Sequence, residues 1–151
     1  IYLLINHLCI TPLGKKGYLF SRLILPLLIA FIISVIIVSL FSITSWNILT
    51  TIIISLLTSM LSLTGTLIVL SFSNNKIEGL ALAKLSGLVM IGIFIPFVIM
   101  DNTQYYFSLL PSFWIAKYLI TSNLMNFTIA LALISIWILI FYRSFIKKLS
   151  V

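Results

Sequence analysis

Histidine, cysteine and acidic residues are scarce in this sequence of 151 residues. It contains one His, one Cys and two acidic residues, which are His7, Cys9, Glu78 and Asp101. A single histidine cannot build a histidine-based metal site, and a single cysteine excludes an internal disulfide and a multi-cysteine metal site. The sequence also has no Gly-rich phosphate-binding loop. It therefore predicts neither a metal centre nor a nucleotide site within this chain.

Charge of either sign is also rare. Charged residues make up 7% of the chain, whereas hydrophobic residues make up 62%. A soluble domain of this length needs far more polar surface, so most of this chain is expected to face lipid. The net charge is +7, but the nine cations are scattered between apolar runs. They form no dense basic stripe of the kind that binds nucleic acid.

Four long apolar runs are present instead. They cover about 23–45, 48–72, 80–100 and 127–145. Each is long enough to cross a bilayer as a helix, and their continuous rather than alternating hydrophobicity argues against membrane strands. The predicted fold is an all-α polytopic membrane domain with four transmembrane helices. Pro26 is expected in the first turn of the first span, and Pro96 is expected to kink the third.

The distribution of Lys and Arg predicts the orientation of these spans. Eight cations precede the first span, separate the second from the third, or follow the fourth: Lys15, Lys16, Arg22, Lys76, Lys84, Arg143, Lys147 and Lys148. Lys117 alone falls on the other side, together with Asp101. The positive-inside rule then places both ends of the chain in the cytoplasm. Glu78 and Asp101 fall on opposite sides of the membrane, so they cannot pair as a catalytic acid and base, and the chain is not expected to be an enzyme.

The longest connection, residues 101–126, lies on the predicted outer side. It contains six aromatic residues and Pro111, and Trp114 is one of the aromatics. This composition predicts short helices that dip into the outer membrane interface. An ordinary aromatic belt and a direct role in gating or cargo contact are both compatible with it.

The third span carries two unusual features. Lys84 lies about one turn inside its cytoplasmic end, where an ammonium group either extends to the membrane surface or marks a functional site. Gly79, Ala83 and Gly87 recur every four residues and predict a face on which another helix packs closely, or a pivot between helices.

Three stretches resemble a known family of transport proteins. They are CITPLGKKGYLFSRLI at 9–24, SNNKIEGLALAKLSG at 73–87 and LLPSFWIAKYL at 109–119. In this order they resemble the permease subunits of ABC-2 type exporters, particularly those of the fluoroquinolone-export type. The resemblance implies that the four spans are helices three to six of a six-helix permease, and that the first two are absent from this sequence.

The resemblance also implies partners and residue roles. The segment 1–22 would be cytoplasmic and contain the coupling helix that docks on a separate ABC ATP-binding subunit, which would bind ATP and Mg. The residues of that coupling helix would be Thr11, Pro12, Leu13, Gly14, Lys15 and Lys16. Such permeases work as homodimers or heterodimers in the bacterial cell membrane and export drug-like hydrophobic or amphipathic molecules. A plain juxtamembrane turn remains the alternative for this segment.

Glu78 is the only acidic residue on the predicted cytoplasmic side. It lies near Lys76 and Lys84, and we expect it to pair with a cation at the cytoplasmic rim and to brace the coupling segment. A secondary transporter or channel component without an ATPase is the alternative function. Such proteins normally carry ionisable groups deep in their spans, and the four runs here have none there.

Overall fold

The computed structural model describes residues 14–42 and 46–149, and every regular element in them is a helix. Four segments are long and apolar enough to cross a membrane, which confirms the all-α, four-span prediction: Phe20–Phe41, Ile48–Phe72, Lys76–Val98 and Leu124–Lys148. The elements in chain order are α2 (Gly14–Phe41), α3 (Ile48–Phe72), α4 (Lys76–Ser86), η1 (Gly87–Ile93), α5 (Ile95–Val98), η2 (Asn102–Phe107), α6 (Pro111–Thr121) and α7 (Leu124–Leu149). The 3₁₀ helices are η1 and η2.

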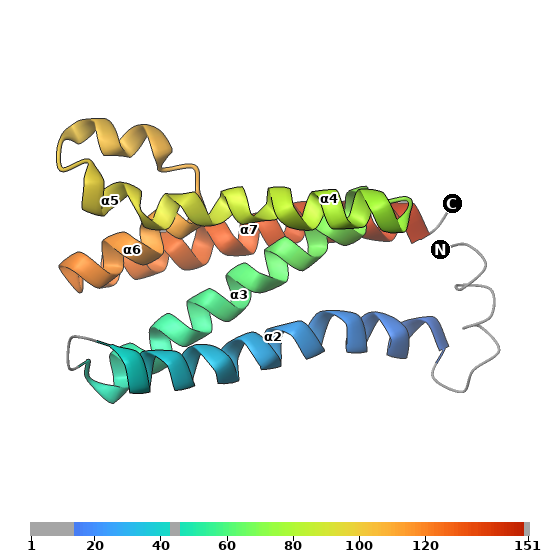
Figure 1. Ribbon diagram of the computed structural model, residues 1–151, viewed down its shortest axis with the longest axis horizontal. Helices are drawn as coiled ribbons and strands as arrows, with labels where there is room; N and C mark the ends of the chain where they lie inside the picture. Colours follow the sequence, from blue (N-terminus) through green and yellow to red (C-terminus); the bar gives the residue numbers. More distant parts are fainter. Residues whose placement is uncertain (1–13, 43–45, 150–151) are drawn as a thin grey trace.

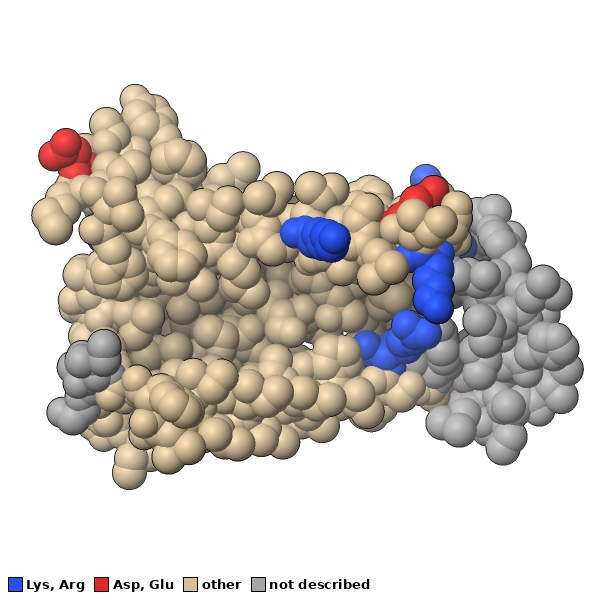
Figure 2. All heavy atoms as spheres, in the orientation of Figure 1, with Lys and Arg blue, Asp and Glu red and all other residues tan. Residues whose placement is uncertain are grey.

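The spans form two layers joined by α3. In Figure 1, α2 lies along one edge, α4 and α7 lie along the opposite edge, and α3 crosses from one to the other. Antiparallel spans bring the beginning of α2, the α3–α4 turn and the end of α7 to the same end. Lys and Arg gather towards this end in Figure 2, as the positive-inside pattern requires for a cytoplasmic side.

The first helix starts well before the apolar run. Because α2 begins at Gly14, Pro26 lies in its interior, and the expectation of a first-turn proline is wrong. A proline there removes one backbone N–H that would bond four residues back. No residue in the most apolar stretch of α2 is buried, so the face of this helix that points away from α3 is open to lipid or to another protein.

The core lies where α3, α6 and α7 meet. Its buried members come from these three helices and are Leu57, Leu61, Ile115, Ala130 and Ile134. Leu57 and Leu61 lie near the middle of α3, so Ile115 at their side places the first turns of α6 level with the middle of that span. Non-helical backbone at such depth is tolerated only where protein covers it.

Two short helices follow the third span, as predicted, and the second is buried. Within α6, Pro111 occupies the first helical position, which needs no N–H donor, and is buried. Trp114 is half-buried, and its Nε1–H donates to the Ser108 carbonyl at 2.7 Å. The helix ends at Ser122, whose φ of 50° reverses the chain into α7. The connection therefore folds in against α3 and α7 and then returns.

Lys117, the cation on the predicted outer side, is held by contacts within the connection 101–126. Lys117 Nζ donates to Gln104 Oε1 at 2.9 Å and lies 5.3 Å from the centre of the Tyr105 ring. Gln104 is buried and comes from η2. These contacts join α6 to η2, so the single cation on the predicted outer side has a structural role.

The third span is broken into three pieces. Seven residues of 3₁₀ helix, Gly87–Ile93, separate α4 from α5. Pro96 explains part of the break, because its ring would clash with the Gly92 carbonyl four residues earlier in a continuous α-helix. The proline lies instead in the first turn of α5, where it is tolerated.

Hydroxyl groups and one lysine tie α3 to its neighbours. Ser34 Oγ and Thr58 Oγ1 are hydrogen-bonded at 2.9 Å between α2 and α3, and Ser71 Oγ donates to the Phe141 carbonyl at 3.0 Å. Lys148 Nζ donates to the carbonyls of Ser71 and Ser73 at the end of α3. A cation there complements the negative end of the helix dipole.

We expect Lys148→Met to lower the free energy of unfolding by about 1–2 kcal/mol, because it removes a charged donor from the last carbonyls of α3. Thermal unfolding in detergent would measure the loss. Lys76→Met is the matched control, since Lys76 is exposed in the first turn of α4, where a cation gains nothing from the helix dipole. Equal midpoints for the two variants would contradict the assigned role.

Candidate functional site

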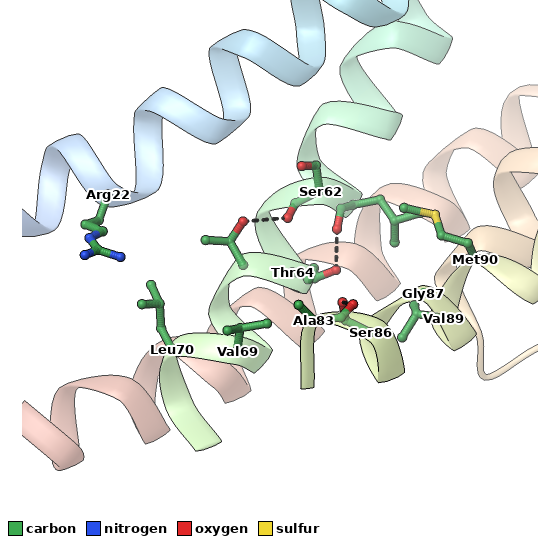
Figure 3. Close-up of a pocket in the computed structure, with 13 residues that line it drawn as sticks. Arg22, Ser62, Thr64, Val69, Leu70, Ala83, Ser86, Gly87, Val89 and Met90 are labelled. Carbon is green, nitrogen blue, oxygen red and sulfur yellow. Dashed lines mark hydrogen bonds between the residues drawn. The ribbon is translucent and has the colours of Figure 1, made fainter. Parts of the chain in front are cut away.

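An open groove of about 440 Å³ lies between α2, α3 and the α4–η1 segment. Figure 3 shows the three walls: Arg22 from α2, Ser62 to Leu70 from α3, and Ala83 to Met90 from α4 and η1. This volume lies within the range of small-molecule sites. Arg22, Val69 and Leu70 belong to the cation-rich end of the domain, so the groove extends from that end towards the membrane centre.

Small residues leave the space that forms the groove. A Cβ added at Gly87 would meet no atom within 4 Å, and one added at Gly65 would lie 3.9 Å from Ser86 Oγ. Ala83 also lines the groove and is exposed. Two residues of the predicted packing face, Ala83 and Gly87, therefore face open space in the single chain. Gly79, the third, lies against Ser73, with 3.6 Å between a built Cβ and the Ser73 Cβ.

Four hydroxyl residues make the apolar walls weakly polar: Ser62, Thr64, Thr66 and Ser86. Thr64 Oγ1 donates to the Leu61 carbonyl at 2.6 Å, Thr66 Oγ1 to that of Ser62 at 3.0 Å, and Ser86 Oγ to that of Ala83 at 2.8 Å. Two of these bonds are drawn in Figure 3. Thr64 is buried, but Thr66 and Ser86 are partly exposed. Because their hydroxyls donate within their own helices, their oxygens are left to accept a hydrogen bond from a bound molecule.

Among the groove-lining side chains that the structure describes, Arg22 is the one that carries a charge, and neither Glu78 nor Asp101 lines the groove. In Figure 3 its side chain extends from α2 towards Leu70. The described residues contain no cluster of three or more His, Cys, Asp or Glu that would hold a metal ion. The geometry suits binding of an apolar or amphipathic molecule, since converging groups for acid–base chemistry are not found along these walls.

The predicted rim residues lie around the α3–α4 turn. Glu78 is in the first turn of α4, and its Oε2 accepts the backbone N–H of Asn74 at 2.8 Å. The bond satisfies a backbone donor in the residue just before Asn75, the N-cap of α4. Glu78 thus has a backbone partner in the α3–α4 turn, and its pairing with a cation of the rim stays a prediction. Lys76 and Lys84 are exposed.

The predicted coupling residues are only partly described. Gly14, Lys15 and Lys16 form the first turn of α2, so they continue directly into the first span. Thr11, Pro12 and Leu13 lie outside the described residues.

A junction between α6 and η1 was not anticipated from the sequence. Ser112 is completely buried, and its Oγ donates to the Val89 carbonyl. Gly92 lies beside it: an added Cβ would overlap Ser112 Oγ and would lie 2.9 Å from the Phe113 backbone nitrogen. Gly92, four residues before Pro96, was the one sequence signal for a close contact here. Its partner Ser112 lies 20 positions later and could not be found from spacing.

Comparison with known protein families matches residues 3–145 to the family described as Fluoroquinolones export permease protein Rv2686c-like. The match covers nearly the whole chain. The chain belongs to this family. It is therefore an ABC-2 type permease, a multi-pass membrane component of a drug-export transporter, as the three resembling stretches predicted. No curated protein and no solved structure matches it.

Proposed function

We propose that this permease exports hydrophobic or amphipathic small molecules by alternating access, driven by ATP hydrolysis in a separate subunit. The observation that carries the proposal is the groove, which joins apolar walls, hydroxyl acceptors and one guanidinium within a membrane domain of this family. An amphipathic cargo would place its apolar part against α3 and its polar end near Arg22.

The energy source is inferred from what the sequence lacks. It has no phosphate-binding loop, so ATP and Mg would be bound by a partner ABC ATP-binding subunit on the cytoplasmic side. Movement of the partner would reach the membrane through the segment of Thr11, Pro12 and Leu13 and the start of α2. Because α2 is continuous from Gly14, a push on its first turn would tilt the wall of the groove that carries Arg22.

The assembly that follows is a dimer of permeases with two ATPases in a bacterial cell membrane, with both ends of this chain in the cytoplasm. The apolar face of α2 that α3 leaves uncovered supports a second membrane-embedded partner, and the gathering of cations at one end supports the orientation. The four spans would be helices three to six of a complete permease.

Affinity purification of the full permease with its ATPase tests the docking. We expect Pro12→Ala/Leu13→Asp to reduce the recovered ATPase at least about tenfold, because an added carboxylate would be buried at the contact. Asn75→Ala is the control, because its exposed side chain makes no cap hydrogen bond in the α3–α4 turn at the same end of the domain. Full recovery of the ATPase with the double variant would contradict docking through this segment.

A further inference from the structure

The 3₁₀ segment η1 forms part of the groove wall, through Gly87, Val89 and Met90. Runs of 3₁₀ helix longer than three or four residues are uncommon, and a stretch inside a longer helix often marks a hinge. This one has seven residues and lies in the middle of a membrane span. We therefore expect a contact that stabilises the 3₁₀ conformation of η1, and one is present.

The restraint comes from the buried outer helix. Ser112, in the first turn of α6, donates its hydroxyl to the Val89 carbonyl in the middle of η1. The close approach depends on Gly92, whose missing side chain admits Ser112 and the Phe113 nitrogen. A helix that enters from the outer side thus bonds directly to the wall of a groove that opens towards the other side.

Conversion of η1 towards α-helix would turn that wall. An α-helix rotates about 100° and rises about 1.5 Å per residue, against about 120° and 2.0 Å for 3₁₀, so each converted residue turns α4 by about 20° and shortens the span by about 0.5 Å. Ala83 and Ser86, which line the groove from α4, would swing away from Gly65 on α3. Ile95 and Pro96 at the start of α5 are buried, whereas α4 has no buried residue, so we expect the rotation to appear in α4.

We propose that η1 is a rotary hinge of the transport cycle, and that Ser112 is the positioning residue that holds it in the 3₁₀ form. We call the hydrogen bond from Ser112 to the Val89 carbonyl the latch. The inference rests on the proposed function in one respect, since ATP-driven movement would supply the force that breaks the latch. The hinge and the latch themselves lie within this chain.

A disulfide assay on the isolated full permease tests the latch. The background is Cys9→Ser together with serine at any other cysteine of the full permease, so that no native thiol remains. The reporter pair is Gly65→Cys with Ser86→Cys, because a Cβ at Gly65 lies 3.9 Å from Ser86 Oγ. Disulfide formation is sensitive to small displacements, so we expect Ser112→Ala to slow the reporter cross-link about tenfold.

The control pair is Ser34→Cys with Thr58→Cys, whose hydroxyls are 2.9 Å apart across α2 and α3. Its rate should not change.

Three results would overturn the latch: an unchanged reporter rate in Ser112→Ala, a faster one, or equal slowing of both pairs, which would indicate general loosening. If Ser112→Ala does not accumulate, the reporter pair is measured in the permease–ATPase complex with and without a non-hydrolysable ATP analogue. Slowing by the analogue supports the hinge, and an unchanged rate contradicts it. Because the Ser112→Ala arm needs no ATPase, a failure of the proposed partner is distinguishable from a failure of the latch.

Discussion

Replacing Gly92 by alanine is expected to destabilise the folded permease by about 3 kcal/mol or more. The added methyl group would overlap Ser112 Oγ and come within 2.9 Å of the Phe113 backbone nitrogen. A backbone atom at the start of a buried helix cannot give way cheaply, so α6 must separate from η1. We expect a lower midpoint in thermal unfolding and less protein in the membrane.

Gly87→Ala is the matched control, because the same change five residues earlier meets no atom within 4 Å. Its stability should be unchanged or raised by up to about 1 kcal/mol, since alanine favours helix over glycine. Equal stabilities for the two variants would show that α6 does not approach η1 as described.

Filling the groove should abolish export without unfolding the protein. We expect Ala83→Trp to lower the export rate at least about tenfold, because the indole ring would occupy much of a hollow of about 440 Å³ from its α4 wall. Export of a fluorescent hydrophobic dye from cells would measure the rate. Ala83 is exposed, so the larger side chain displaces no packed neighbour.

The control for this prediction is Ala81→Trp. Ala81 is also exposed on α4 but does not line the groove, since residues two apart lie on different faces of a helix. Wild-type export with Ala81→Trp and loss with Ala83→Trp would link transport to the groove. Equal rates for the two variants would contradict a cargo path there.

The four spans could be predicted from the sequence because uninterrupted apolar length is a one-dimensional signal. The all-α class needs no more than the rule that membrane backbone must bond internally. Pro26 shows the limit of this reasoning: the end of an apolar run is not the end of a helix, and α2 continues through Lys15 and Lys16. The break in the third span was partly foreseen from Pro96, but the 3₁₀ form of Gly87–Ile93 also depends on a contact from α6.

The groove itself could not be predicted, because it requires three elements to be placed relative to one another. Ser62, Thr64 and Arg22 fit lipid-exposed or packing positions equally well when read alone. The sequence of Gly79, Ala83 and Gly87 predicted a close helix contact, and spacing cannot say whether small residues admit a neighbouring helix or leave a hollow. Glu78 was expected to pair with a cation of the cytoplasmic rim, and its bond to the backbone N–H of Asn74 could not be read from charge alone.

The central claim is that this permease moves cargo only when a separate ATPase drives it. The most direct measurement is dye accumulation in inside-out vesicles that contain the full-length permease with its ATPase. Uptake should require both proteins and hydrolysable ATP, and it should be lost with Ala83→Trp in the same vesicles. Uptake by vesicles with the permease alone, driven by an ion gradient and indifferent to ATP, would contradict the account and favour a secondary transporter.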